Sequence, residues 1–438
     1  MSTPETTTPV AQVAATYNTT IAERESKAFF WKFALAYFGT CLVWAGPSQL
    51  LLANQMITVR PDRYEDALAL LMMCGGATAV VTSLLVGFIA DRSRLSNYSA
   101  WAKRWGKRFP WILLAVPLSS LGMLVMSFTP GYWVLVALWC LVQLFVAFMT
   151  NNLFTITADV VPQKKFGTIS GILGVTYVLG LVGGTAIASL FPLNWAYIVI
   201  AGLSLGLVIQ LGFGRGSIDP AVNQSTLDEQ AELGAFVFGS DAGEAEKLPL
   251  SAYRNYWTVF FSRFVMHVTQ YTALFYLLYY LRDHIKVDDP DTWVLILTVV
   301  FAAVTMFTAV VAGPLSDKLE RRKIFIILAA LTMAAATVIM TFVDAVQFVV
   351  GAAVLLGLAW GMFSSVEQAL INESLPSKVN RARDVSIMTL AQGTANMMAG
   401  ILAAAGLKYL GGYPGLYEAC AVACVIGALL ALTIRSSR

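Results

Sequence analysis

The chain has 438 residues, of which 58% are hydrophobic and only 13% are charged, and its mean hydropathy is +0.69. A soluble protein of this length would form two or three domains with far more surface charge, so the composition excludes an ordinary water-soluble protein. The formal net charge is only +3. Basic residues that flank apolar segments are explained by membrane insertion, and we expect no nucleic-acid partner.

The apolar residues fall in long runs of roughly 20, the length that crosses a bilayer as a helix. Charged or turn-forming linkers separate most of these runs. In chain order the segments are expected near 29–57, 67–90, 111–128, 132–158, 168–191, 194–213, 255–281, 293–316, 324–343, 346–371, 383–408 and 413–434. The sequence therefore predicts an all-α integral membrane protein with twelve transmembrane helices.

Two polar stretches lie outside these segments. Residues 1–28 are Thr-rich and contain no apolar core of a signal peptide, which predicts a disordered cytosolic tail. Residues 214–254 are rich in acidic residues and poor in aliphatic ones, which predicts a cytosolic linker. Residues 29–213 and 255–438 are then two six-helix bundles.

All five cysteines lie inside predicted membrane segments, and none has the spacing of metal ligands. We interpret them as small packing residues and expect neither a metal nor a cofactor. No Gly-rich phosphate loop is present, which disfavours ATP as the energy source. No catalytic constellation is found either, so an enzyme is not expected. The cysteines are Cys41, Cys74, Cys140, Cys420 and Cys424.

The basic residues are distributed unevenly between alternate loops. With the N-terminus in the cytoplasm, 23 of the 29 lysines and arginines fall on the inner side and five on the outer side. Inner loops of membrane proteins carry this excess. The pattern predicts a multi-pass protein of the plasma (inner) membrane with both termini in the cytoplasm.

Short motifs recur in the two halves of the chain. Gly87–Arg92 and Gly313–Lys318 both read Gly-x-x-x-Asp followed by a basic residue, and Asp159–Pro162 and Glu373–Pro376 both read acid-x-x-Pro. One insertion in the first loop brings these motifs into a common register, together with the pairs Lys107-Arg108 and Arg321-Arg322. The repeat predicts two related, pseudo-symmetric halves, a known transporter architecture.

This loop motif resembles that of the major facilitator superfamily, in which two six-helix bundles enclose a central substrate path. The run Arg104–Ile112 is also similar to the loop of glycoside–pentoside–hexuronide and sucrose-type symporters. Two features differ from those symporters. Residues Leu95–Ala102 lengthen the loop, and Ser83 and Ala79 stand where the cation-coupled symporters carry aspartates. Sodium coupling at that position is therefore not expected.

The loop motif is expected to gate the cytoplasmic side. Small glycines allow helices to approach closely, and the aspartates can pair with neighbouring basic residues or helix ends. Such contacts would form when that side is shut and break when it opens; alternatively, the charges only cap helix ends and face water. The residues assigned to this gate are Gly87, Asp91, Arg92, Gly106, Lys107, Arg108, Gly313, Asp317 and Arg321.

The resemblance implies a cavity lined by the first, fourth, seventh and tenth helices. Polar and aromatic side chains on these helices suit a sugar, whose apolar face stacks on rings and whose hydroxyls need donors and acceptors. The same residues can instead pack or join helices. The candidate substrate residues are Trp44, Gln49, Trp139, Gln143, Asn151, Asn152, Gln270, Tyr271 and Trp360.

Ionisable groups are costly inside a membrane and commonly functional there, and the predicted seventh and tenth helices carry Arg263, His267 and Glu367. His267 and Glu367 are the candidate proton carriers, and an unperturbed imidazole titrates at about 6.5, near cytoplasmic pH. Arg263 lies at a depth similar to that of Glu367, so the two can pair. That pair is either part of the proton path or purely structural.

These observations favour a secondary transporter, in which a small-molecule substrate, a proton and the lipid bilayer are the partners of a monomer. The preferred hypothesis is proton-coupled uptake of a sugar or glycoside, and the alternative is proton-coupled efflux of amphipathic small molecules. A non-transporting receptor or membrane enzyme is disfavoured, because the 214–254 segment is small for a sensory domain.

Overall fold

The computed structural model describes residues 29–92, 109–129, 131–160, 166–213, 253–319, 321–374 and 381–433, except for the side chains of 87–92 and of some other residues near helix ends. All regular secondary structure within these ranges is helical. The predicted tail 1–28 lies outside them, as does nearly all of the predicted linker 214–254.

The helices of the first half run alternately in opposite directions. The first, over Phe29–Val59, contains a π turn, η1 (Pro47–Leu51), and ends as α2 (Leu52–Val59). It is followed by α3 (Tyr64–Arg92), α6 (Phe109–Ser127), α7 (Tyr132–Val160), α8 (Phe166–Leu190), α9 (Leu193–Ile209) and the short η3 (Gln210–Gly212).

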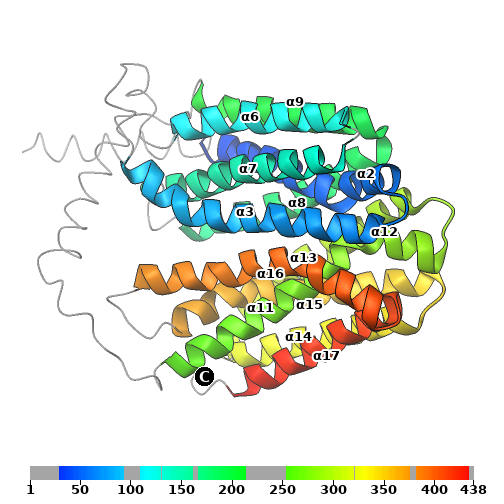
Figure 1. Ribbon diagram of the computed structural model, residues 1–438. Helices are drawn as coiled ribbons and strands as arrows, with labels where there is room; N and C mark the ends of the chain where they lie inside the picture. Colours follow the sequence, from blue (N-terminus) through cyan, green and yellow to red (C-terminus); the bar gives the residue numbers. More distant parts are fainter. Residues whose placement is uncertain are drawn as a thin grey trace, which may run out of the picture.

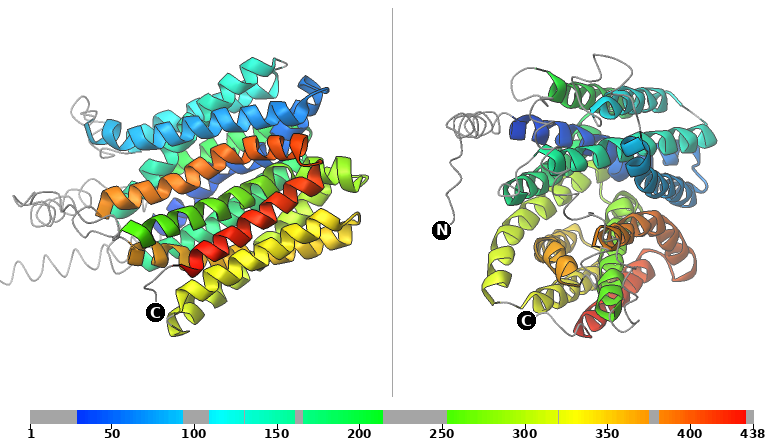
Figure 2. Two further views of the ribbon diagram at one scale, coloured as in Figure 1. Left: turned by 60° about the horizontal axis from the view of Figure 1, so that its bottom comes forward. Right: turned by 90° about the vertical axis from the view of Figure 1, so that its left-hand side faces the viewer.

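The second half repeats this order. Its first helix is divided into α11 (Arg254–Phe275), α12 (Leu277–Tyr279) and a π segment, η5 (Tyr280–Ile285). The others are α13 (Pro290–Leu319), α14 (Arg322–Phe342), α15 (Val346–Ser374), α16 (Arg381–Tyr409) and α17 (Tyr413–Leu432). The two halves form separate layers in Figure 1, and Figure 2 shows them from one end in its right-hand view.

Two ends of the molecule can be distinguished (Figure 1). We call the end that holds Phe29, Arg254 and Leu432 the terminal end, and the opposite end, with Val59 and Tyr413, the far end. Under the orientation predicted from lysine and arginine, the terminal end faces the cytoplasm and the far end faces outside.

Eleven helices among the described residues are long and apolar enough to cross a membrane. The stretch α11–η5 is the twelfth predicted membrane segment. The predicted helical architecture of two bundles is thereby confirmed. This stretch carries Arg263, His267 and Gln270, which lower its hydropathy. Its part from Met266 to Leu281 is nevertheless enclosed, since every residue in that range is buried. Neighbouring helices, and not lipid, surround its polar groups.

The first helix of each half departs from α geometry in its far-end part. In the first half, Pro47 has no N–H to donate within the helix, and the chain forms the π turn η1 around it. In the second half, the helix that the sequence predicts as continuous over 255–281 is interrupted at Tyr276 and continues as η5. These two irregular segments meet at the interface between the halves.

Close helix approach explains one pair of glycines in the first half. A Cβ on Gly184 of α8 would lie 2.7 Å from the backbone nitrogen of Gly46, and a Cβ on Gly46 would lie 2.9 Å from the carbonyl oxygen of Gly184. Only two glycines allow these backbones to come so close.

We predict that Gly184→Val lowers the thermal unfolding temperature in detergent by several degrees, because the added side chain would overpack this contact at a cost of about 1–3 kcal/mol. Gly202→Val is the matched control, since Gly202 is also in a helix and has nothing within 4 Å of an added Cβ. Equal unfolding temperatures for the two variants would contradict the close contact.

Candidate functional site

A cavity of about 1270 Å³ lies between the two halves. Its wall is formed by the first helix, α3, α7 and α8 of one half and by α11, α15 and α16 of the other. The residues of the first helix that line it, Tyr37 to Trp44, precede the π turn, and Ser83 and Ile387 lie on the terminal-end parts of α3 and α16. The cavity therefore extends from mid-depth toward the terminal end.

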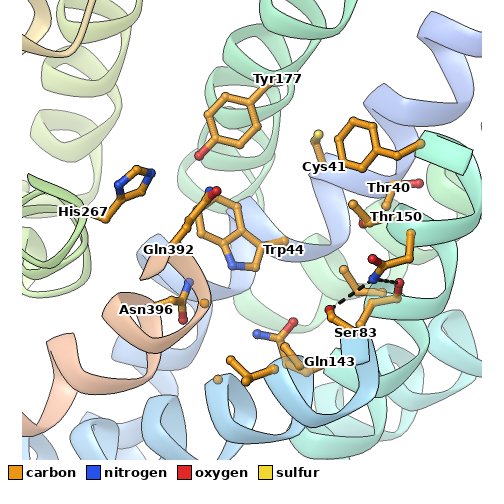
Figure 3. Close-up of a pocket in the computed structure, with 18 of the residues that line it drawn as sticks. Thr40, Cys41, Trp44, Ser83, Gln143, Thr150, Tyr177, His267, Gln392 and Asn396 are labelled. Carbon is orange, nitrogen blue, oxygen red and sulfur yellow. Dashed lines mark hydrogen bonds between the residues drawn. The ribbon is translucent and has the colours of Figure 1, made fainter. Parts of the chain in front are cut away.

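Aromatic rings from both halves form the deep part of the wall (Figure 3). The Trp44 ring is stacked on Tyr177 at a centroid distance of 6.2 Å and meets Tyr271 edge-on at 6.3 Å. Tyr271 in turn stacks on Phe275 at 5.7 Å. Rings so arranged present apolar faces and edges, and the two phenols add hydroxyl groups.

Side-chain amides supply the polar part of the wall. The amide nitrogen of Asn151 donates to Ser83 Oγ over 3.1 Å. Gln392 of α16 bridges two neighbours: Arg263 donates to its Oε1 over 3.2 Å, and its Nε2 donates to the hydroxyl of Tyr271 over 3.1 Å. The cavity is also lined by the amides of Gln143 and Asn396, both shown in Figure 3.

An ion pair joins α11 to α15 beside the cavity. Arg263 Nη1 lies 3.1 Å from Glu367 Oε1, and the two side chains are 10% and 15% exposed. The ring of His267 is buried against Trp360 at 5.1 Å, and its Nδ1 lies 2.9 Å from the carbonyl oxygen of Arg263. A carbonyl only accepts, so this geometry places the proton of the neutral imidazole on Nδ1. Glu367 Oε1 is 3.9 Å from the same Nδ1.

The structure brings the three predicted proton-coupling residues together and divides the predicted substrate residues into two groups. Those that line the cavity are Trp44, Gln143, Asn151, Tyr271 and Trp360. Those that lie elsewhere are Gln49, Trp139, Asn152 and Gln270.

Each residue of the second group has different surroundings. Gln49 accepts a hydrogen bond from Thr298 over 3.2 Å, and Asn152 donates to the carbonyl of Phe148 in its own helix. Trp139 is fully buried. Gln270 lines a separate cavity of about 30 Å³ within the second half. Consecutive helical residues point about 100° apart, and in each of the pairs Asn151-Asn152 and Gln270-Tyr271 one member lines the cavity and the other does not.

Polar residues of the wall also come from helices other than the first, fourth, seventh and tenth. Tyr177 lies on α8, and Gln392 and Asn396 lie on α16. A signal for the α16 pair was present, because Gln392, Thr394 and Asn396 interrupt an apolar segment. Tyr177 is the only tyrosine of α8, and its neighbours in the sequence give no sign that it lines a cavity and does not merely pack.

Most predicted gate residues fall outside the described part of the structure. Gly106, Lys107 and Arg108 lie outside it altogether, and the side chains of Gly87, Asp91, Arg92 and Asp317 are not described. Of the others, Gly313 lies on α13, where an added Cβ would be 3.8 Å from Ser365 of α15, and Arg321 is exposed immediately before α14. Within the described residues, no group of three His, Cys, Asp or Glu could hold a metal ion.

Sequence comparison identifies the family and one distant relative. The family model for the Major Facilitator Superfamily matches residues 96–297 and 259–438. A "Putative proline/betaine transporter" of Staphylococcus haemolyticus (strain JCSC1435) is 26% identical over 286 residues, which span 61% of this chain and 57% of the relative.

Solved structures with a similar fold are also transporters. A POT family transporter in complex with a thioalcohol-conjugated peptide has a TM-score of 0.71 at 13% identity, over 92% of this chain and 95% of that one. A peptide transporter, POT, has a TM-score of 0.71 at 14% identity, over 92% of this chain and 93% of that one. A nucleoside transporter has a TM-score of 0.67 at 13% identity, over 93% of this chain and 100% of that one. Identities this low show a shared fold alone.

We predict that the Arg263–Glu367 pair shows strong thermodynamic coupling. Glu367→Gln leaves a buried guanidinium without its counter-charge, a change that costs about 3–5 kcal/mol in buried pairs. The double variant Arg263→Met, Glu367→Gln removes both charges and should regain much of the lost unfolding temperature in detergent. If the loss in the double variant equals the sum of the losses in Arg263→Met and Glu367→Gln alone, the two side chains do not interact.

Proposed function

We propose that this chain, which belongs to the Major Facilitator Superfamily, takes up a sugar or glycoside together with a proton by alternating access. That it is a membrane transporter follows from the family. The observation that carries the finer proposal is a cavity between the halves that joins aromatic rings to amide groups and holds its charges as a pair.

The composition of the wall suits a neutral polyhydroxy molecule. The rings of Trp44, Tyr177 and Tyr271 offer apolar contact to the C–H face of a sugar. The amides of Gln143, Gln392 and Asn396 can both donate to hydroxyls and accept from them. Arg263 and Glu367 neutralise each other, so an uncharged substrate leaves no charge unbalanced.

The two ends of the interface support alternating access. The cavity extends toward the terminal end, whereas hydrogen bonds join the halves at the far end, for example from the Tyr279 hydroxyl to the Ala53 carbonyl over 3.0 Å. With the predicted orientation, this is a state open to the cytoplasm. We propose that the loop motifs around Asp91 and Asp317 close the cytoplasmic side in the opposite state.

The charged wall suggests how a proton could be coupled to the substrate. A proton on Glu367 would neutralise the carboxylate that holds Arg263, and a proton on His267 would place a second positive charge beside that guanidinium. In either case Arg263 shifts its bonding, and Gln392 transmits the shift to Tyr271 in the aromatic wall. Substrate and proton thereby act on one connected set of side chains.

A small zwitterion is the second candidate substrate. The relative named as a proline/betaine transporter favours it, although that match covers just over half of the relative. The aromatic wall beside a carboxylate also suits a quaternary ammonium group, which binds ring faces. Efflux of amphipathic molecules is less well supported, because amides from α7 and α16 make part of the wall polar.

We predict that proteoliposomes accumulate radiolabelled substrate from a sugar and glycoside panel only when the external side is acidic. Trp44→Ala should weaken uptake about fivefold, since loss of a ring face costs about 1 kcal/mol. Trp195→Ala is the control, because Trp195 is 61% exposed away from the cavity. Accumulation of proline or glycine betaine alone would replace the sugar with the second candidate.

We predict that replacing the proton carrier abolishes gradient-driven accumulation but leaves counterflow exchange, because exchange needs no net proton movement. The variants are His267→Gln and Glu367→Gln, each measured in both assays. His284→Gln is the matched control, since His284 lies at the far end, away from the cavity. If both cavity variants still concentrate substrate, the proton uses another path, and Asp159 or Glu373 becomes the next candidate.

A further inference from the structure

The far end of the interface carries a second set of ionisable residues, separate from the cavity. Glu65 of α3 belongs to the first half, whereas Arg282 and Asp283 of η5 and Tyr413 of α17 belong to the second. With Tyr64, these residues form what we call the far gate. The Tyr413 hydroxyl donates to Glu65 Oε1 over 2.5 Å, and the Tyr64 hydroxyl donates to Asp283 Oδ2 over 3.0 Å. Both bonds connect opposite halves.

Backbone contacts around the far gate hold the halves closely together. The Tyr276 hydroxyl donates to the carbonyl oxygen of Glu65 over 3.2 Å. A Cβ on Gly400 of α16 would lie 2.9 Å from the carbonyl oxygen of Ala69 in α3. Nearby, Asn54 donates to Asp291 across the same interface over 2.9 Å. Movement of the halves apart at this end must break all of these contacts and admit water to Glu65.

The charges of the far gate do not balance when both carboxylates are ionised. Arg282 forms two hydrogen bonds with Asp283, at 2.6 and 3.0 Å, and its guanidinium lies 4.6 Å from the centre of the Tyr64 ring. Glu65 has no such basic partner among the described residues, and the Tyr413 oxygen stands between it and Asp283, which is 3.4 Å away on the other side. One negative charge is in excess.

Several other charged or titratable groups near the far gate have contacts away from Glu65. Asp66, next to Glu65, pairs with Arg63 over 2.9 Å on the exposed side of α3. Lys408 of α16 is exposed and lies over the Tyr409 ring. His284 of η5 stacks on Tyr280, with its ring 6.2 Å from Tyr413, and its Nε2 is 3.8 Å from Asp344. None of them supplies the missing positive charge to Glu65.

We propose that Glu65 is a proton-binding site whose protonation holds the far gate shut. In the closed state, the Glu65 carboxylate is partly buried and faces the carboxylate of Asp283 across a single phenol, whereas separation of the halves hydrates it and removes that neighbour. Burial opposes the ionised form most strongly, and the neighbouring carboxylates of Asp283 and Asp66 add to this effect, whereas the Tyr413 hydroxyl and the more distant Arg282 favour ionisation. A protonated Glu65 keeps the contact by donating to the Tyr413 oxygen.

Linkage sets the direction of the effect. Because the closed far gate holds a proton on Glu65 more tightly than the open one, acid stabilises closure and alkali promotes opening. Under the predicted orientation, the proton enters from the outside, the side from which a symporter takes its coupling ion. The site needs no substrate, so it can be tested whether or not the proposed sugar is transported.

The test measures the separation of the halves at the far end by double electron–electron resonance. Spin labels are placed at Asp62→Cys of the first half and Gln347→Cys of the second, both exposed positions at that end. The five native cysteines are replaced by alanine, and the unfolding temperature checks each variant. In lipid nanodiscs, the ratio of long to short distances should rise several-fold from pH ~5.5 to pH ~8.5, because the closed state binds the proton of Glu65 more tightly than the open state does.

Three variants separate proton binding at Glu65 from other causes. Glu65→Gln should keep the short distance across the whole range, because it imitates the protonated acid. Asp66→Asn, the adjacent exposed carboxylate, should follow the parent. Tyr413→Phe removes the partner of Glu65 across the interface in both protonation states, so it should raise the share of long distances at every pH. The proposal is wrong if the parent distances do not change with pH, or if Glu65→Gln titrates like the parent.

Discussion

The enclosure of charge on one helix is the constraint on which the rest of this structure depends. Arg263 and His267 make α11 too polar to face lipid, where an ionised group is costly. The helix is therefore surrounded by protein from Met266 to Leu281, and Glu367 of α15 balances the guanidinium at 3.1 Å. The side chains that bury and balance the charges of α11 also surround the cavity. The same residues therefore serve both the stability of the bundle and the proposed coupling.

The irregular far-end parts of the first helix and of the α11–η5 stretch complete this arrangement. They place Tyr276 and Tyr279 where their hydroxyls reach main-chain carbonyls of the opposite half. Closure at the far end thus includes directional hydrogen bonds and Glu65, whereas the cavity extends toward the terminal end. A wholly apolar interface would hold the halves together to the same extent at any pH. Hydrogen bonds and a carboxylate without a basic partner make the closure reversible and sensitive to pH.

The candidate site could be predicted only in part, and the reason lies in helix rotation. Arg263, His267 and Tyr271 are all predicted site residues of this helix, and the structure has His267 and Tyr271 in the cavity wall and Arg263 beside it, paired with Glu367. Gln270 was predicted as well, but it lines the small cavity within the second half. A one-residue step turns a side chain by about 100°, and in a helix buried on every side no polar stripe shows which way it turns.

The sequence by itself determined the class of protein, the number and order of the helices, the duplication and the superfamily. These properties depend on hydropathy over about 20 residues and on short local motifs, because lipid forces each apolar segment to satisfy its own backbone hydrogen bonds as a helix. Only the tertiary structure decided that Tyr177, Gln392 and Asn396 meet Trp44, and that Glu65 meets Tyr413 across 348 positions of the chain. Contacts between helices depend on how each rotates and where it breaks, and packing among all twelve settles both.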